Sequence, residues 1–322
     1  MNKREALVAV TSRSFSKNFS LVEELKKHYS NVLLNHTGKT LKDEELIEFL
    51  KKADKAIIGI EKITDSLLSQ LPNLKVISKY GVGLNNIDLD LLKNHNVRLG
   101  FTPGVNKQSV AELALALILT GLKKIQENNI DILNGNWSQE RGSELYGKTI
   151  GIIGFGNIGQ KLASLIQPFN CNILFFDERN FLKEDLKLLA NDLNLNLDLV
   201  TQSSLRSILL KSNILSIHLP LTQKTKDLIS LEEFSELKSD VCIVNTARGG
   251  IVNENDLHEF LNNNPGAYAG FDVFKEEPAF NNPLLKLPNF FGTSHRSSLT
   301  NEGIYSMGIA AINGLDDNIE IT

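Results

Sequence analysis

A glycine-rich segment, Gly154-Phe155-Gly156-Asn157-Ile158-Gly159, constrains the fold of this chain more than any other feature. On its own the pattern G-x-G-x-x-G is weak, because it arises by chance in many chains. Here it directly follows an apolar run at residues 149–153, which is typical of a buried strand, and it opens a helix expected over residues 160–166. This context of strand, turn and helix predicts a dinucleotide-binding unit.

The positions within the segment have different physical tasks. Gly154 allows a tight turn, Gly156 lets the backbone approach a pyrophosphate, and Gly159 permits close packing of the helix on the strand. Asn157 and Ile158 precede the expected helix, whose N-terminus offers free backbone N–H groups and the positive end of its dipole to the phosphates. We therefore predict that these five residues bind the cofactor.

Asp177 ends the next expected strand, 18 residues past Gly159, where a ribose-binding carboxylate belongs. A carboxylate at this place accepts hydrogen bonds from both ribose hydroxyls and repels a 2′-phosphate, which favours NAD over NADP. Arg179 is the contrary signal, because a nearby cation could hold that phosphate. The alternative, a cluster of turn glycines beside a solvated aspartate, accounts less well for the whole context.

The rest of the chain alternates between strand-like and helix-like runs. At about 150 residues per domain, 322 residues predict two domains. Strands are expected in the first part at 6–10, 32–34, 56–60, 75–78 and 97–100, with amphipathic helices such as 21–28 and 44–51 between them. A second series has strands at 150–153, 173–176, 197–200, 214–217, 241–244 and 267–271, a short strand near Phe290 and a last helix at 301–313. This predicts an α/β fold with two doubly wound parallel sheets.

Between the two series lies a long helical stretch, expected over residues 107–133. Its first half, residues 111–119, is apolar on most faces. Such a helix is buried either by its own chain or by a partner subunit. The pattern alone leaves both alternatives open.

Composition excludes several classes of protein. The 34 basic and 38 acidic residues give a net charge of −4, which disfavours nucleic-acid binding. Cys171 and Cys242 sit in separate apolar runs without metal-ligand spacing, so we expect no metal site and a reducing, cytoplasmic location. The longest apolar stretch, Leu113 to Leu119, is far shorter than the roughly 20 residues that span a bilayer, so no membrane association is expected.

Three later segments place polar residues at the ends of expected strands, where open α/β sheets bind ligands. They contain Arg248 before two glycines, Asp272 and Glu277 in an acidic loop, and His295 in Thr293-Ser294-His295-Arg296. Taken singly, each has a plainer interpretation as a surface cation, a solvated loop or an ordinary histidine. The hypothesis of a catalytic site depends on these segments occurring together in one chain.

Together with other motifs, these segments resemble the D-isomer-specific 2-hydroxyacid dehydrogenase family over nearly the whole chain. The phosphoglycerate dehydrogenase-like branch is the most similar. The motifs that carry the resemblance are Lys79-Tyr80-Gly81-Val82-Gly83, Thr102-Pro103-Gly104, Ser109-Val110-Ala111-Glu112, Asn136-Trp137, Gly147-Lys148-Thr149 and His218-Leu219-Pro220. The resemblance implies a flavodoxin-like substrate domain, residues 1–103 plus 296–322, with a Rossmann NAD-binding domain inserted at 104–295. It also implies a homodimer through the cofactor domain.

The resemblance further implies roles for individual residues in the transfer of a hydride between NAD and C2 of a 2-hydroxy or 2-keto acid. Arg248 would bind the substrate and stabilise the developing oxyanion. His295 would be the general acid or base, oriented by Glu277, which favours the protonated ring. Further cofactor contacts would come from His218, Pro220, Thr246, Ala247 and Asp272, and substrate contacts from Lys79, Tyr80, Val82 and Gly83.

Some positions depart from the family pattern. Lys79 stands where relatives often have arginine, Asn85 where aspartate is common, and Arg296 where a small or apolar residue is more usual. No arginine occurs in residues 57–62, where true phosphoglycerate dehydrogenases tend to hold a phosphate, so glyoxylate, hydroxypyruvate or a larger acid remain alternatives. Glu277 rather than glutamine argues against the formate dehydrogenase branch. An NAD-sensing binding module of corepressor type is the alternative from another class.

Overall fold

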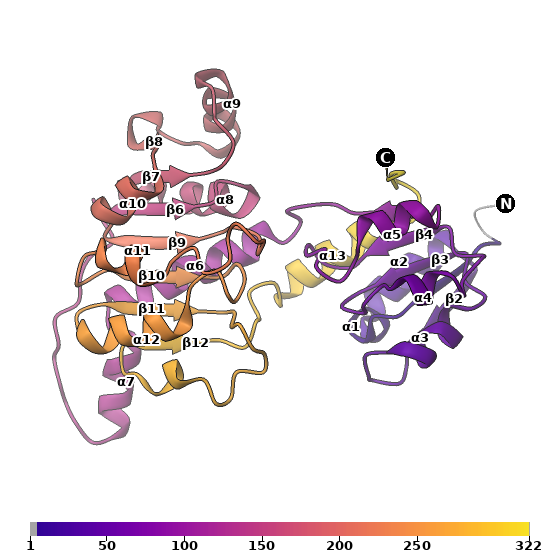
Figure 1. The fold of residues 1–322 in the computed structure, drawn as a ribbon, viewed down its shortest axis with the longest axis horizontal. Coiled ribbons are helices and arrows are strands. Elements are labelled where there is room, and N and C mark those ends of the chain that lie inside the picture. Colours follow the sequence, from indigo (N-terminus) through magenta and orange to yellow (C-terminus); the bar gives the residue numbers. More distant parts are fainter. Residues whose placement is uncertain (1–4, 322) are drawn as a thin grey trace. The chain divides into compact units, whose positions relative to one another are not determined.

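The computed structural model describes residues 5–321, which form two compact units (Figure 1). The first comprises residues up to Asn106 together with those from Leu299 onward, and the second comprises Lys107–Ser298. The second unit is therefore an insertion between two parts of the first. The assignment of substrate and cofactor roles to these units stays a prediction, and residues 1–4 and 322 of the expected substrate domain lie outside the described residues.

The first unit is built on a parallel sheet of five strands in the order β2-β1-β3-β4-β5. This is the flavodoxin-like order: β2 lies on one side of β1, and β3, β4 and β5 are added in turn on the other side. The central strands β1, β3 and β4 are buried along nearly their whole length, as expected for a parallel sheet covered by helices on each side, whereas no residue of the edge strand β2 is buried. The strands are β1 Leu7–Val10, β2 Asn31–Leu34, β3 Lys55–Ile58, β4 Val76–Lys79 and β5 Arg98–Gly100. The helices are α1 Arg13–Lys17, α2 Phe19–His28, α3 Asp43–Leu50, α4 Asp65–Leu68, α5 Leu89–Asn94 and the returning α13 Asn301–Gly314.

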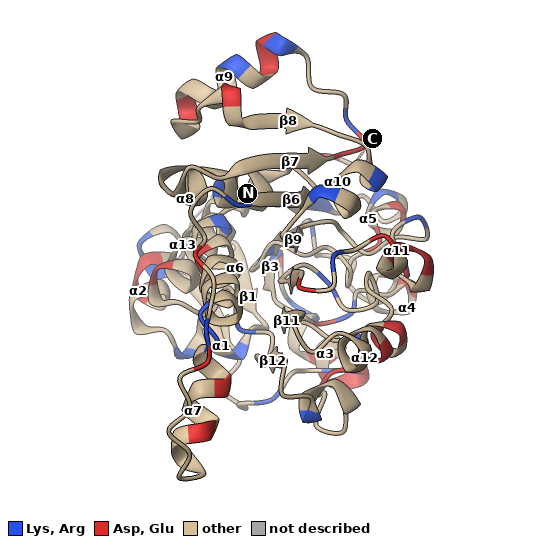
Figure 2. Cartoon of the chain, turned by 90° about the vertical axis from the view of Figure 1, so that its left-hand side faces the viewer, with Lys and Arg blue, Asp and Glu red and all other residues tan. Residues whose placement is uncertain are grey.

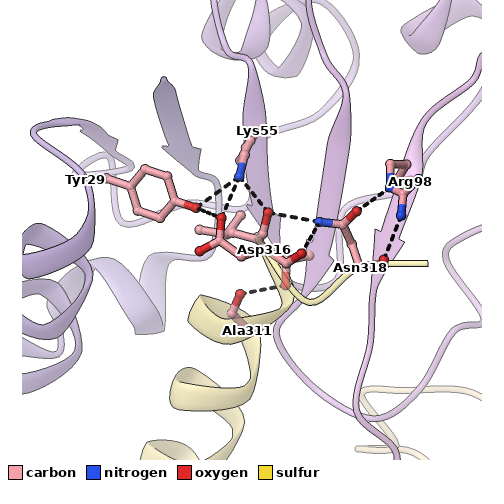
Figure 3. Close-up of polar contacts among 8 residues, drawn as sticks. Tyr29, Lys55, Arg98, Ala311, Asp316 and Asn318 are labelled. Carbon is pink, nitrogen blue, oxygen red and sulfur yellow. Dashed lines mark hydrogen bonds and ion pairs between the residues drawn. The ribbon is translucent and has the colours of Figure 1, made fainter. Parts of the chain in front are cut away.

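The returning C-terminal segment is tied to the amino-terminal ends of the strands (Figure 3). Lys55 Nζ donates to the carbonyl of Leu315 at 2.7 Å and to Asp316 Oδ1 at 2.9 Å, and the Tyr29 hydroxyl donates to the same carboxylate at 2.7 Å. Arg98 holds Asn318 in the same way, with Nη2 donating to its carbonyl at 2.9 Å. Both partners of each of these bonds belong to the first unit. The bonds therefore hold the C-terminal segment against the strands formed by the beginning of the chain.

The second unit is built on a parallel sheet of seven strands in the order β12-β11-β10-β9-β6-β7-β8. Counted from β6, six of these strands have the doubly wound order of a dinucleotide-binding sheet, and β12 extends it at one edge. The strands are β6 Thr149–Ile153, β7 Asn172–Phe176, β8 Val200–Gln202, β9 Ile214–Ile217, β10 Cys242–Asn245, β11 Tyr268–Phe271 and β12 Phe290–Gly292. The helices are α6 Lys107–Leu122, α7 Ile125–Leu133, α8 Asn157–Ile166, α9 Lys183–Leu193, α10 Leu205–Lys211, α11 Leu231–Ser235 and α12 Glu254–Asn263, with short 3-10 turns at Gln167–Phe169, Leu197–Leu199 and Pro283–Lys286. The predicted α/β fold class with two parallel sheets is confirmed.

The structure corrects the expected helix over residues 107–133. It is two helices, α6 and α7, because the backbone of Lys124 takes a left-handed conformation with φ of 50°. Gly121 lies so close to Tyr268 that a Cβ there would come within 2.2 Å of the ring. The end of α6 is therefore pressed on the sheet, and α7 leaves it in a new direction, extending beyond the sheet in Figure 1.

Two other expected boundaries differ from the structure by three residues. Residues 197–199 form a 3-10 turn, and the strand begins only at Val200. The helix of the glycine-rich segment begins at Asn157, three residues earlier than expected, so Asn157 and Ile158 belong to its first turn. Within residues 5–321, no helix is long and apolar enough to cross a membrane.

Candidate active site

The residues singled out in the second unit gather at one edge of the seven-stranded sheet. Gly154 follows β6, Asp177 follows β7, His218 follows β9, and Thr246, Ala247 and Arg248 follow β10. Asp272 follows β11 and His295 lies three residues past β12. Since all these strands are parallel, their carboxyl ends share one edge, which is where open α/β sheets bind ligands.

The glycine-rich turn has the geometry that its sequence predicts. Gly154 has a φ of +95°, and a Cβ there would lie 2.6 Å from the carbonyl oxygen of His218. A Cβ on Gly159 would lie 2.2 Å from the carbonyl oxygen of Gly154, whereas nothing lies within 4 Å of one on Gly156. No side chain caps the N-terminus of α8. The turn is therefore closely packed on its inner side and open at Gly156, beside a helix N-terminus without a side-chain cap.

Asp177 is joined to this turn. Its Oδ2 accepts the backbone N–H of Phe155 at 2.7 Å, and its Oδ1 accepts that of Arg179 at 3.0 Å. The guanidinium of Arg179 stacks on the ring of Phe181, 3.9 Å from its centroid. The carboxylate is thus oriented by the backbone, and the cation beside it is directed onto an aromatic ring.

Two buried polar atoms lie at the ends of adjacent strands. Within the described residues, His218 Nδ1 and Thr246 Oγ1 have no hydrogen-bond partner. The other ring nitrogen of His218 contacts Ser216 Oγ at 2.8 Å, and burial lowers the pKa of His218 to about 3, so the ring is neutral. A buried polar atom without a partner costs about 1–3 kcal/mol, which a bound ligand can offset by supplying one. Pro220 continues this loop, and its carbonyl accepts the Thr225 hydroxyl at 2.6 Å.

Arg248 is held by a turn that the sequence analysis missed. Asn245, 1% exposed, accepts the N–H of Ala247 at 3.0 Å and donates to the carbonyl of Arg248 at 3.0 Å. Arg248 Nη1 donates to the carbonyl of Ala247 at 2.7 Å. Burial lowers the pKa of Arg248 from its ordinary value, and the charge of Glu277 opposes that shift. An asparagine directly after a buried strand is a signal for such a turn.

Glu277 and His295 form a direct pair, although 18 residues separate them in the chain. His295 Nδ1 lies 2.8 Å from Glu277 Oε2, and Glu277 Oε1 accepts the backbone N–H of Phe274 at 3.0 Å. The two side chains remain 47% and 37% exposed. With Nδ1 engaged by the carboxylate, Nε2 of the ring is the atom able to exchange a proton with a substrate.

Asp272 organises the loop that carries His295. It is fully buried, and its carboxylate accepts the Thr293 hydroxyl and the backbone N–H groups of Arg296 and Ser297, the last two at 2.8 Å. Its carbonyl accepts the N–H of His295 at 2.8 Å. His295 has a φ of +49°, a conformation that costs about 1–3 kcal/mol and persists only where the surrounding contacts hold it. The predicted contact of Asp272 with the nicotinamide stays a prediction, since its carboxylate is engaged within this loop.

In the first unit, the expected substrate residues begin with Lys79, the last residue of β4, and continue into the turn that follows it. The ammonium of Lys79, 6% exposed, donates to the carbonyl of Gly59 and, at 2.7 Å, to Asn86 Oδ1. The ring of Tyr80 packs edge-on against Phe15, and burial raises its pKa. The N–H groups of Val82 and Gly83 have no acceptor among the residues that the structure describes. Lys79 therefore serves its own unit, while the next turn offers N–H groups to a ligand.

Two further observations concern the charge of one helix and the side chains that could bind a metal ion. Figure 2 shows acidic and basic residues interspersed along α9, so that helix carries no run of basic residues of the kind that binds a phosphate backbone. Within residues 5–321, no three His, Cys, Asp or Glu side chains gather closely enough to hold a metal ion.

Comparison with known proteins gives a consistent result. The family described as D-isomer specific 2-hydroxyacid dehydrogenase, NAD binding domain, matches residues 115–297. The chain is 34% identical over 271 residues to D-3-phosphoglycerate dehydrogenase of Methanocaldococcus jannaschii, covering 83% of this chain and 50% of that protein. It is 33% identical over 301 residues to hydroxypyruvate reductase of Thermotoga maritima, covering 90% and 94%. Thus it spans about half the length of the first relative and nearly all of the second.

Solved structures agree with the sequence relatives. D-lactate dehydrogenase from Aquifex aeolicus, complexed with NAD and lactic acid, has a TM-score of 0.78 at 26% identity, covering 95% of this chain and 93% of that one. The matched family confirms the prediction that the chain binds NAD. The sequence relatives and the shared fold lead to one conclusion: this chain belongs to the D-isomer specific 2-hydroxyacid dehydrogenase family.

Proposed function

We propose that the protein catalyses hydride transfer between NAD and C2 of a D-2-hydroxy acid or the corresponding 2-keto acid. The observation that carries this proposal is the contact of 2.8 Å between His295 and Glu277, with Arg248 close enough for its charge to interact with Glu277. An acid–base pair beside a fixed cation suits a reaction in which a carbonyl oxygen gains or loses a proton.

The residues of the second unit fit NAD. The open position at Gly156 and the N-terminus of α8 would take the pyrophosphate, and Asp177 would accept hydrogen bonds from the ribose hydroxyls. His218 Nδ1 and Thr246 Oγ1 are buried atoms that still need a partner. Ala247 and Pro220 belong to the same two loops. When bound, the nicotinamide supplies or accepts the hydride.

The other residues would supply position and charge. Arg248 would bind the carboxylate and carbonyl oxygen of the substrate and stabilise the oxyanion as it develops. His295 would donate a proton through Nε2 in reduction and accept one in oxidation, while Glu277 holds Nδ1. Val82 and Gly83 would donate their N–H groups to the substrate carboxylate, with Tyr80 beside them.

For the substrate, we propose an unphosphorylated acid such as hydroxypyruvate or glyoxylate in preference to a phosphorylated one. The loop after β3 has a carboxylate, Glu61, 3% exposed, which accepts the N–H of Gly59 at 2.8 Å. The nearby cation, Lys79, is engaged by the same loop through the Gly59 carbonyl. A phosphate placed here would meet a buried negative charge and a cation already in use. A phosphoglycerate dehydrogenase-like activity is the second candidate, supported by the Methanocaldococcus relative.

We further propose that α7 pairs with a second copy of the chain. Ile125, Ile132 and Leu133 on α7 are 54%, 53% and 77% exposed, and the nearby Trp137 is 82% exposed. No residue of α7 is buried in the monomer. Apolar side chains that the monomer leaves uncovered favour an interface. Light scattering of the wild type and of Leu133→Glu tests this proposal. We expect the wild type to be a dimer and the substitution to weaken that dimer.

The proposed reaction is tested by following NADH oxidation with a panel of 2-keto acids. We expect turnover of hydroxypyruvate or glyoxylate to exceed that of phosphohydroxypyruvate, and NADH to be used in preference to NADPH. Asp177→Ala should reduce the preference for NADH, with Asp198→Ala on the same unit as the control. Tight binding of NADH without turnover of any acid would contradict an enzyme and favour the NAD-sensing alternative.

A further inference from the structure

Glu254, the first residue of α12, makes two short hydrogen bonds that no role in the preceding sections explains. Its Oε1 accepts the backbone N–H of Lys275 at 2.6 Å, and its Oε2 accepts Nδ2 of Asn282 at 2.6 Å. These two partners stand at the beginning and the end of the loop that carries Glu277. One carboxylate therefore fixes both ends of that loop, residues 275–282.

The same loop contacts the turn of Arg248. A Cβ on Gly249 would come within 2.0 Å of the Phe274 carbonyl and 2.4 Å of Lys275 N. The peptide group between Phe274 and Lys275 is thus held on one side by Gly249 and on the other by Glu254. The N–H of Phe274, next to that peptide, donates to Glu277 Oε1 at 3.0 Å. A continuous series of contacts leads from Glu254 through this peptide to Glu277 and then to His295.

The position requires a carboxylate rather than an amide. Asn282 uses its Oδ1 to accept the N–H of Leu284 at 3.0 Å, so its amide is oriented with Nδ2 toward Glu254. Glutamine at 254 has only one acceptor oxygen, and its amide nitrogen would face a donor. The N-terminus of α12 also stabilises negative charge at this residue.

We propose that Glu254 is a positioning residue for the Glu277–His295 pair. It would touch no reacting atom, and its effect on catalysis would pass through the loop that holds Glu277. This inference rests on the proposed function, because the pair has a catalytic task only if the protein transfers a hydride to or from a 2-hydroxy acid.

The kinetic test compares Glu254→Ala, Glu254→Gln and the matched control Glu259→Ala, an exposed acid on the same helix. We expect kcat for hydroxypyruvate or glyoxylate reduction to fall about tenfold in Glu254→Ala, since small misplacement of catalytic groups is costly. KM and the Kd of NADH should stay within about twofold, because this account removes no binding contact. Glu254→Gln should be intermediate, and Glu259→Ala unchanged. Wild-type kcat in Glu254→Ala would overturn the proposal.

A double-mutant cycle separates positioning from a general loss of structure. If Glu254 acts through Glu277, then Glu254→Ala should have no further effect on the residual turnover of Glu277→Ala. Equal fractional losses in both backgrounds would overturn the proposal. Hydrogen exchange of residues 274–282 gives a readout without turnover, with faster exchange expected in Glu254→Ala than in Glu259→Ala. If the wild type reduces no 2-keto acid, the proposed function fails. Unchanged hydrogen exchange in Glu254→Ala would instead overturn the inference that Glu254 fixes the loop of residues 275–282.

Discussion

The carboxyl edges of the two sheets use charged residues in opposite ways. At the five-stranded sheet, Lys79 and Glu61 are 6% and 3% exposed, and both bond to Gly59 of their own unit. At the seven-stranded sheet, His295 and Glu277 bond to each other and remain about half and one-third exposed. The first arrangement holds loops together, and the second leaves the proposed proton-transfer group accessible.

The supporting residues differ in the same sense. In the first unit, Asn86 links Lys79 to Glu61. Its Oδ1 accepts from Lys79 Nζ at 2.7 Å, and its Nδ2 donates to the Glu61 carbonyl at 2.6 Å. In the second, His218 and Thr246 keep buried atoms without a partner among the described residues. Burial with complete pairing is typical of a structural network, whereas the unpartnered atoms of His218 and Thr246 would gain a partner from the proposed cofactor. The contrast leads to four predictions.

The largest expected effect is on the exposed pair. His295→Ala should lower kcat by about 1,000-fold, because it removes the general acid of the reduction. The Kd of NADH should change little, since the glycine-rich turn and Asp177 are untouched. Steady-state kinetics and fluorescence titration with NADH measure the two quantities. Wild-type turnover in this variant would remove His295 from the mechanism and erase the contrast between the two edges.

Asp272→Asn should affect both the stability and the activity of the second unit. The aspartate accepts three hydrogen bonds from the loop of His295, and an amide leaves at least one buried donor without an acceptor. We expect a loss of about 3 kcal/mol in the free energy of unfolding, together with a lower kcat. Urea unfolding measures the first quantity. Asp198→Asn, in an exposed turn, serves as the control and should be neutral.

Lys79→Met should act on stability more than on substrate affinity. The substitution leaves the buried carbonyl of Gly59 and the amide oxygen of Asn86 with one donor fewer, which we expect to cost about 2 kcal/mol. Thermal unfolding and the KM for the keto acid distinguish the two effects. An unchanged melting temperature combined with a KM raised more than about tenfold would mean that Lys79 binds the substrate directly, as the family resemblance implies.

The smallest effect concerns pH. Burial lowers the pKa of His218 to about 3, below the value of about 6.5 that it has in the unfolded chain. Between these values the unfolded chain takes up a proton that the folded one does not, so stability is lost as the pH falls below about 6.5. The contribution of this residue is up to about 1.4 kcal/mol per pH unit. Urea unfolding between pH 7 and 5 should show a shallower pH dependence in His218→Gln than in His258→Gln.

Much of the fold could be predicted from sequence because its signals are local. The glycine-rich turn requires a positive φ at Gly154 and close packing at Gly159, and both demands appear in the residue types. The break at Lys124 could not be predicted, since Lys124 is neither glycine nor proline. Gly121, near the end of α6, requires a glycine because it meets Tyr268 of β11, a contact that only the folded chain makes.

The candidate site was predictable only in part for the same reason. Arg248, Glu277 and His295 lie in loops that follow strands, within recognisable motifs, so their types and places could be expected. Glu254 could not, because its two partners lie 21 and 28 residues away and only the folded loop brings them to it. The hydrogen bond from Lys79 to the carbonyl of Gly59, 20 residues earlier, likewise could not be predicted from the sequence.

Transfer of deuterium from NADH that carries deuterium at both C4 positions of the nicotinamide tests the central claim most directly. The wild-type protein is incubated with labelled NADH and hydroxypyruvate or glyoxylate, and the product is analysed by mass spectrometry and NMR. The account predicts one deuterium at C2, in the D configuration where the product is chiral, and no measurable transfer with His295→Ala over the same time. Product without deuterium at C2, or equal transfer by the variant, would contradict it.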